Sequence, residues 1–412
     1  MSRTTSSWTS LSRKAARALS NRLREYGRGG SDGFTLANIP RADIALHFSD
    51  PPSKLYQLQQ WLPIFEAGPR PTIVVTRTIE TYDALAGATS LPVLLVPTFE
   101  DLMALYDTAN FRCVVYVNNG WSNFQSLAYQ EAVHIHVNHG ESDKICMVSN
   151  QAKAYDRVFV AGRAAVERHR AALAWFDESR LVPVGRPQLD LEITPPVFPH
   201  SGPTITYAPT WEGEDEANNY TSIDRYGMAL IAAALAQPGA RVLYKPHPRI
   251  VTSTTPAIRQ AHERITEAIH QAGAPHASLP RADMLGVIQV TDLLISDVSS
   301  VSLDHLYLRP ESPILLCDRR SDPTRLVDDT PVARSATTID ATTIDNARAI
   351  IGSTLAEDRL RDARTEMRQY YFGDPSPGDS THRFWSAIDR AIDDHDAAVR
   401  NLQRTRVTGE VS

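Results

Sequence analysis

The chain has 412 residues, of which 42% are hydrophobic and 22% are charged, as in a folded globular protein. This length exceeds one ordinary hydrophobic core, so we expect two domains of similar size. The cysteines, Cys113, Cys146 and Cys317, are odd in number and far apart, which argues against a disulfide framework or a zinc site and indicates a reducing compartment. The sequence has no apolar run of the roughly 20 residues that a membrane span needs, and no apolar signal-peptide core.

The net charge of -6 is unevenly distributed along the chain. Residues 1–30 hold seven basic residues against Glu25 alone, a net charge of +6, so the remaining residues carry -12. Between Trp8 and Tyr26, apolar residues recur at steps of three or four, which predicts an amphipathic helix. Two interpretations remain open: a basic helix on an anionic membrane surface, or a solvated helix that docks on its own domain. With the glycine-rich linker that follows, this segment spans residues 1–33.

From residue 40 onward, apolar runs alternate with segments of helical periodicity. The runs that we predict as strands are residues 42–48, 71–76, 91–97, 113–118, 132–138 and 156–162, then 204–210, 240–249, 291–297 and 312–318. Several are apolar throughout, which is typical of parallel strands covered on both faces by helices. The sequence therefore predicts an α/β fold with two Rossmann-like domains, residues 34–185 and 186–375, whose parallel sheets face a central crevice. Residues 376–412 are predicted to form a C-terminal helix and tail.

Ligands of open α/β sheets bind at the carboxyl ends of the strands, so polar residues that directly follow the predicted strands are candidate site residues. In the second domain these residues are Thr210, Trp211, Glu212, Lys245, His247, Arg249, Asp297, Ser299, Ser300 and Asp304. In the first domain they are Asn138, His139, Glu141, Ser142 and Lys144.

A helix that begins at Ser299 or Ser300 would offer free backbone N–H groups and the positive end of its dipole to an anion such as phosphate. The same serines are also ordinary helix caps. Asp304, one turn later, is interpreted either as a solvated carboxylate or as an acceptor for a ribose hydroxyl.

The segment KPHPR places His247 between two prolines, with Lys245 and Arg249 as fixed positive charges nearby, which favours a phosphate-binding histidine. The segment NHG, residues 138–140, is typical of a general base followed by a glycine that lets a substrate approach. The alternative for His139 is a strand-end residue that bonds only its own loop. His134 and His136 alternate along a strand, so we predict that they are packed or surface residues rather than metal ligands. The sequence has no phosphate-binding loop of the G-x-x-x-x-G-K-[ST] or G-x-G-x-x-G type.

Three segments, YAPTWEG (207–213), YKPHPR (244–249) and DLLISDVSSVSLDHLYLRP (292–310), resemble in order and spacing the CDP-glycerol glycerophosphotransferase family, which includes teichoic acid polymerases and primases. VGRPQLD (184–190) is similar to that family's Gly-x-Pro-x-x-Asp turn, and residues 373–388 resemble its closing segment. The sequence departs from the family at NHGESDK (138–144), where a Trp-His-Gly-Thr-Pro-like stretch with a following lysine is usual.

The resemblance implies a GT-B-like fold in which the second domain holds CDP-glycerol or a related CDP-polyol. It implies transfer of the polyol phosphate to a hydroxyl of a polymeric or lipid-linked acceptor, with release of CMP. His139 would act as the general base, and His247 would contact the pyrophosphate. Ser299 and Ser300 would add hydrogen-bond donors, and Gly140 and Lys144 would lie on the acceptor side. We expect no cofactor, no metal and no nucleic acid, and a cytoplasmic protein. Peripheral attachment to the inner face of the cell membrane depends on which of the two interpretations of the basic N-terminal helix holds.

Two other classes of function stay open at this point. A GT-B glycosyltransferase or epimerase that uses a sugar nucleotide would share the fold and the phosphate site. A non-catalytic binding protein of envelope assembly would keep the fold and the donor site without turnover.

Overall fold

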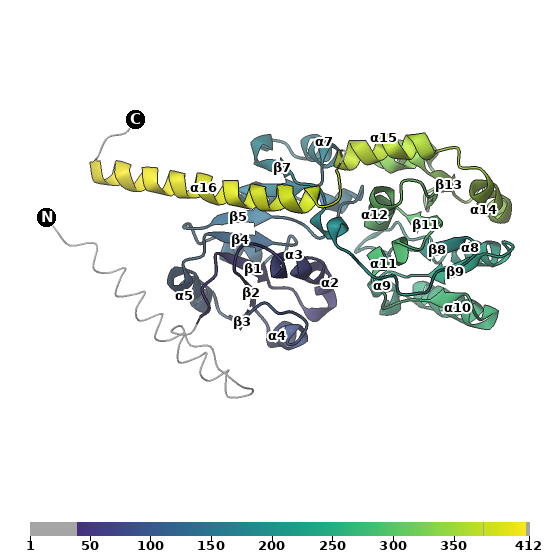
Figure 1. Cartoon of the computed structure of the whole chain (residues 1–412), viewed down its shortest axis with the longest axis horizontal. Coiled ribbons are helices and arrows are strands. Elements are labelled where there is room, and N and C mark those ends of the chain that lie inside the picture. Colours follow the sequence, from purple (N-terminus) through teal and green to yellow (C-terminus); the bar gives the residue numbers. More distant parts are fainter. Residues whose placement is uncertain (1–38, 374, 409–412) are drawn as a thin grey trace.

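The computed structural model describes residues 39–373 and 375–408, and these residues form two parallel sheets (Figure 1). The first sheet has the strand order β3-β2-β1-β4-β5-β6-β7. Its strands are β1 (Ile44–Phe48), β2 (Thr72–Thr76), β3 (Val93–Leu95), β4 (Cys113–Tyr116), β5 (Val133–His136), β6 (Arg157–Val160) and β7 (Leu181–Pro183). The basic helix predicted between Trp8 and Tyr26 lies outside the described residues, so its membrane contact stays a prediction.

The second sheet has the strand order β10-β9-β8-β11-β12-β13. Its strands are β8 (Thr204–Ala208), β9 (Arg241–Tyr244), β10 (Ala277–Ser278), β11 (Leu293–Asp297), β12 (Ile314–Cys317) and β13 (Thr337–Ile339). All ten strands predicted from the sequence are present, each over a shorter range. Strands β7, β10 and β13 were not predicted, because they are only two or three residues long and lack an extended apolar run.

Helices cover both faces of each sheet, as uniformly apolar strands require. Around the first sheet they are α2 (Tyr56–Gln59), α3 (Leu62–Glu66), α4 (Ile79–Leu85), α5 (Phe99–Ala109), α6 (Asn123–Ser126) and α7 (Arg163–Ala172). Around the second sheet they are α8 (Gly227–Leu235), α9 (Pro248–Val251), α10 (Pro256–Ala272), α11 (Met284–Ile288), α12 (Ser300–Leu308), α13 (Pro323–Asp329), α14 (Ala347–Ala356) and α15 (Arg361–Phe372). Strand β1 shows the result: Ile44, Leu46 and Phe48 belong to one core cluster, and Ala45 belongs to another on the opposite face.

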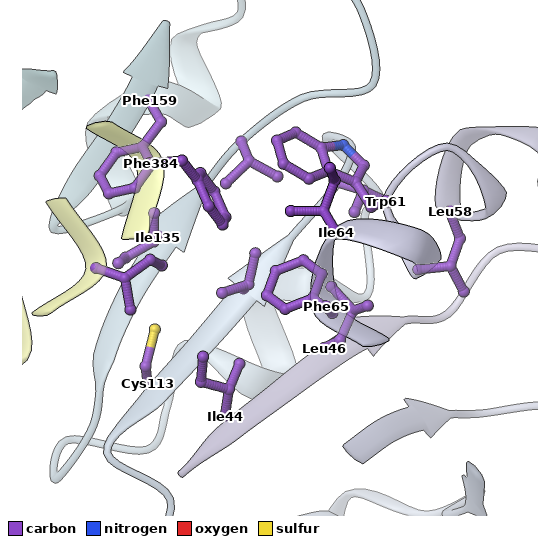
Figure 2. Packing of buried hydrophobic residues seen from close by; sticks show 14 of the residues in the cluster. Ile44, Leu46, Leu58, Trp61, Ile64, Phe65, Cys113, Ile135, Phe159 and Phe384 are labelled. Carbon is purple, nitrogen blue, oxygen red and sulfur yellow. The ribbon is translucent and has the colours of Figure 1, made fainter. Parts of the chain in front are cut away.

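The long C-terminal helix α16 (Asp379–Thr408) returns from the second sheet and lies along the first (Figure 1). Figure 2 shows its residue Phe384 within the core that β1, α3 and β5 also build. Phe384 is fully buried, and its ring centroid lies 5.2 Å from that of Trp61 and 5.8 Å from that of Phe65. The helix therefore completes the hydrophobic core of the first sheet.

Within residues 39–373 and 375–408, no helix is both long enough and apolar enough to cross a membrane.

Candidate active site

The loop after β5 carries His139 and is fixed by its neighbour Asn138. Asn138 has a φ of 55°, a left-handed conformation that asparagine tolerates better than most residues. Its side-chain Oδ1 accepts a hydrogen bond from the His139 N–H at 2.8 Å, and its carbonyl accepts one from the Trp61 indole at 2.6 Å. His134 and His136 are buried in β5 at 5% and 4% exposure, and the His136 ring stacks on Tyr155, so they are packed residues, as predicted.

The residues after His139 are held by a buried ionic cluster. Arg168 on α7 pairs with Glu141 at 2.5 Å and with Asp143 at 2.8 Å, and the Tyr371 hydroxyl on α15 donates a hydrogen bond to Asp143. These partners fix the loop against two helices. Lys144, at the end of the loop, reaches out from the cluster towards the second sheet.

The loop also approaches residues that follow the strands of the second sheet. The Lys144 ammonium donates a hydrogen bond to the Thr210 hydroxyl at 2.8 Å. A Cβ atom placed on Gly140 would lie 3.4 Å from the Ser300 Cβ, so the glycine directly faces the start of α12. Ser299 caps that helix by accepting a hydrogen bond from the Val301 N–H at 3.3 Å, which confirms the predicted helix start. The loop that carries His139 and the predicted phosphate site are therefore adjacent.

Asp304 does not lie open to solvent. It is 6% exposed, and its carboxylate is 2.9 Å from the guanidinium of Arg186, so the interpretation as a solvated carboxylate is wrong. Burial raises the pKa of Asp304 to about 6, although Arg186 acts in the opposite direction. Any contact of Asp304 with a ribose hydroxyl would have to share the carboxylate with Arg186.

His247 follows β9, and its ring caps α9. Its Nδ1 accepts a hydrogen bond from the Arg249 N–H at 3.1 Å, so the neutral ring carries its proton on Nε2. Burial, followed by the positive charges of Lys144, Lys245 and Arg249, holds the pKa of His247 well below its ordinary value. His247 is therefore a neutral hydrogen-bond donor near neutral pH.

The side chains around His247 supply the positive charge of this site. Lys245 is 6% exposed, and burial lowers its pKa to about 8, so its ammonium group is still mostly charged at pH 7. The Arg249 guanidinium lies 3.5 Å from the ring centroid of Trp211, a cation–π contact, and also pairs with Glu214 at 3.0 Å. Trp211 in turn lies 6.3 Å from the His247 ring.

Asp297 is fully buried at the end of β11 and organises the loop after β8. Its two carboxylate oxygens accept hydrogen bonds from the N–H groups of Thr210 at 2.8 Å and Ser222 at 3.1 Å. Burial raises the pKa of Asp297 to about 7, against the effect of these hydrogen bonds. Asp297 thus positions Thr210, and through it the end of Lys144.

The ring of Tyr56, at the start of α2, lies close to both histidines. Its centroid lies 6.1 Å from that of His139 and 5.6 Å from that of His247. The structure therefore brings the predicted base and the predicted phosphate-binding histidine against the ring of the same tyrosine. Tyr56, Gln57 and Arg186 were not predicted as site residues. Arg186 lies inside the VGRPQLD segment. The other two belong to α2, which residues 49–55 separate from β1, so a search of the residues directly after each strand does not reach them.

A pocket with about 600 Å³ of empty space, part of it open to solvent, lies beside the His139 loop. Its polar lining includes Asn119, Asn138, Glu141, Arg186 and Gln188. The pocket is also lined by Gly140, the neighbour of His139 in the chain.

Two Rossmann-like domains that hold one polar site at the carboxyl ends of their parallel strands define the GT-B class of proteins. The solved structures agree with this fold. The wall teichoic acid polymerase TagF matches with a TM-score of 0.54 at 13% identity, over 94% of this chain and 98% of that chain. A glycosyltransferase from Rickettsia africae matches with a TM-score of 0.52 at 11% identity, over 86% of this chain and 99% of that chain. A UDP-GlcNAc 2-epimerase from Neisseria meningitidis, bound to UDP-GlcNAc, matches with a TM-score of 0.54 at 9% identity, over 84% of this chain and 99% of that chain.

The sequence identifies the family within this class. Residues 73–317 match the family model of CDP-glycerol:poly(glycerophosphate) glycerophosphotransferases, and the chain belongs to that family. The resemblance noted in the motifs is thereby confirmed. No curated protein sequence matches the chain significantly. A variant of TagF soaked with CDPG matches with a TM-score of 0.52 at 14% identity, over 95% of this chain and 99% of that chain.

Proposed function

We propose that this protein transfers glycerol phosphate, or a related polyol phosphate, from a CDP-activated donor to a hydroxyl group of a cell-envelope polymer or a lipid-linked acceptor, and releases CMP. The observation that carries the proposal is that His139 and His247 both lie against the ring of Tyr56. His139 follows β5 of the first sheet and His247 follows β9 of the second, so the proposed proton acceptor and the proposed donor-phosphate site come together from the two halves of the chain.

In the proposed reaction, the acceptor oxygen attacks the β-phosphorus of the donor while His139 takes the hydroxyl proton. The bond between the β-phosphorus and the oxygen that bridges it to CMP breaks, and CMP leaves with the electron pair. Burial lowers the pKa of His139 to about 4, so the ring is neutral and able to accept a proton at pH 7. The bound diphosphate would raise this pKa, because a neighbouring negative charge favours the imidazolium form.

The donor phosphates would lie between His247 and the start of α12. The Nε2–H of His247 is free to donate, because Nδ1 already accepts from the backbone. Lys245 adds positive charge, and Ser299 and Ser300 bring hydroxyls and the free N–H groups of a helix start. These groups are fixed before the substrate arrives, which is what stabilising the charge of a phosphoryl-transfer transition state requires.

The acceptor would enter beside Gly140 and Lys144, next to the pocket on the first sheet. A lipid-linked acceptor lies at a membrane surface, so we propose that the protein acts peripherally on the inner face of the cell membrane. The net charge of +6 on residues 1–30 supports this location, because basic residues are attracted to an anionic membrane surface.

The experiment that tests the proposed function compares donors. CDP-glycerol, CDP-ribitol and UDP-GlcNAc are incubated separately with the protein and a glycerol-phosphate oligomer as acceptor. Release of CMP from a CDP-polyol, with lengthening of the oligomer, is expected. Turnover of UDP-GlcNAc in place of the CDP-polyols would assign the site to sugar nucleotides, and donor binding without any CMP release would make the protein a binding protein.

A further inference from the structure

The buried side chain of Gln57 lies against the proposed base. It belongs to α2, which follows β1 after a short connecting segment, and is 8% exposed. Its amide nitrogen Nε2 is 3.5 Å from Nε2 of His139 and 3.3 Å from the hydroxyl of Tyr56. A polar group held so close to a proposed general base affects how that base carries its proton.

The orientation of the Gln57 amide follows from the hydrogen bonds of Asn118, on the loop after β4. The Oδ1 atom of Asn118 accepts from the Gly120 N–H at 3.1 Å, so its other atom, Nδ2, is the donor. This Nδ2 donates to Oε1 of Gln57 at 2.8 Å and to the carboxylate of Asp50 at 2.9 Å. With its oxygen engaged by Asn118, Gln57 turns its NH₂ group towards His139.

An amide NH₂ group can only donate, so the ring nitrogen that faces it has to accept. Nε2 of His139 is therefore the unprotonated nitrogen, and the proton of the neutral ring is on Nδ1. We propose that Gln57 is a positioning residue that selects this tautomer of His139 and so keeps the Nε2 lone pair available to the acceptor hydroxyl. The contact of 3.5 Å is at the long end of the hydrogen-bond range, so an arriving hydroxyl can replace it at little cost.

A glutamate at position 57 would favour the opposite tautomer of His139. Both carboxylate oxygens accept, so one would bond Asn118 and the other would require a proton on Nε2 of His139. The Gln57→Glu change is thus predicted to reverse the tautomer and to raise the pKa of the ring. The charged groups around His139 act in both directions: Arg186 and Lys54 lower the pKa of the ring, whereas Asp50 raises it. The neighbouring titratable rings are those of His136 and His247.

The inference rests on the proposed function for the role of His139 as the base, but the tautomer can be measured without any substrate. Nitrogen-15 NMR of the full chain, with the His139 signals assigned by their loss in His139→Ala, reports which ring nitrogen carries the proton. We expect Nδ1–H in the parent and Nε2–H in Gln57→Glu. The exposed Gln59 on the same helix provides the control, since Gln59→Glu adds the same charge and is expected to keep Nδ1–H.

Transfer assays complete the test. We expect CMP release to fall by about 10²-fold or more in Gln57→Glu, as for a general base lost to the wrong tautomer, and to change less than twofold in Gln59→Glu. Gln57→Leu removes the hydrogen-bond-donating NH₂ group without adding charge, and it replaces Gln57→Glu in the test if that variant does not fold. Gln57→Leu is expected to show a mixture of tautomers. Nε2–H in the parent, or an unchanged tautomer in both Gln57 variants, would overturn the inference. A parent with Nδ1–H that releases no CMP from any donor would support the tautomer and contradict the proposed function alone.

Discussion

The side chain of His247 has two separable tasks, and replacing it with asparagine tests them separately. In the folded protein, Nδ1 caps α9 through the Arg249 N–H, while Nε2–H is free for a donor phosphate. Asparagine is among the best helix caps, so His247→Asn should keep the cap and lose only the phosphate contact. His247→Ala should lose both.

The size of each effect follows from the kind of hydrogen bond. A hydrogen bond to a charged phosphate contributes about 1.5–3 kcal/mol, which corresponds to a roughly 10- to 150-fold weaker Kd for the donor in both variants. A lost helix cap costs about 1 kcal/mol of folding stability, and this should be seen only in His247→Ala. The neutral state of His247 adds a pH criterion. Because burial and the neighbouring cations hold its pKa well below the ordinary value, the contribution of His247 to affinity should be constant between pH 6 and 8.

The assay is calorimetric titration with CDP-glycerol, together with urea denaturation of the same preparations. His270→Asn, on the exposed side of α10, is the matched control and should bind like the parent. Parent-like affinity in His247→Asn would remove His247 from the donor site. An affinity contribution that disappears as the pH rises through about 6.5 would show that His247 binds phosphate as a cation, and would refute the reasoning from its burial.

Three further predictions concern other parts of the chain. His139→Ala should leave donor affinity nearly unchanged and lower transfer by roughly 10²- to 10⁴-fold. In the parent, kcat/KM should fall as the pH drops through about 4, because the base is then protonated. This decrease should be missing in the mutant, and a decrease that persists there would show that another group is the base. Deletion of residues 1–30 should release the protein from anionic vesicles without weakening CDP-glycerol binding, whereas equal vesicle binding by both forms would place the membrane contact elsewhere. Phe384→Ala should reduce the free energy of unfolding by about 3–5 kcal/mol, measured in urea, because the ring is fully buried; a change below 1 kcal/mol would mean that α16 is not part of the core.

Local patterns were sufficient to predict much of this molecule. The apolar runs predicted ten strands and their parallel arrangement, because strands buried on both faces leave few positions for polar residues. The pair Ser299 and Ser300 predicted the start of α12, since a cap is set by residues within one turn of the helix.

Other features depend on contacts between segments far apart in the sequence. Gln57 lies 82 residues from His139, and nothing in the sequence around it indicates that Asn118 turns its amide towards the ring. Asp304 was open to interpretation as a solvated carboxylate because its partner, Arg186, belongs to a different segment. The position of α16 on the first sheet likewise follows from packing between distant apolar faces, which periodicity along one helix does not specify.

The return of α16 to the first sheet also has a consequence for how the chain is made. A ribosome delivers β1 to β7 first, but the core beneath them lacks Phe384, Trp385, Ile388 and Ile392 until synthesis has passed the whole second sheet. Until then, the aromatic rings of Trp61, Phe65 and Phe159 have no cover from this helix. The half that is translated first is therefore completed last, and the nascent chain exposes an apolar surface that a chaperone can recognise during that interval.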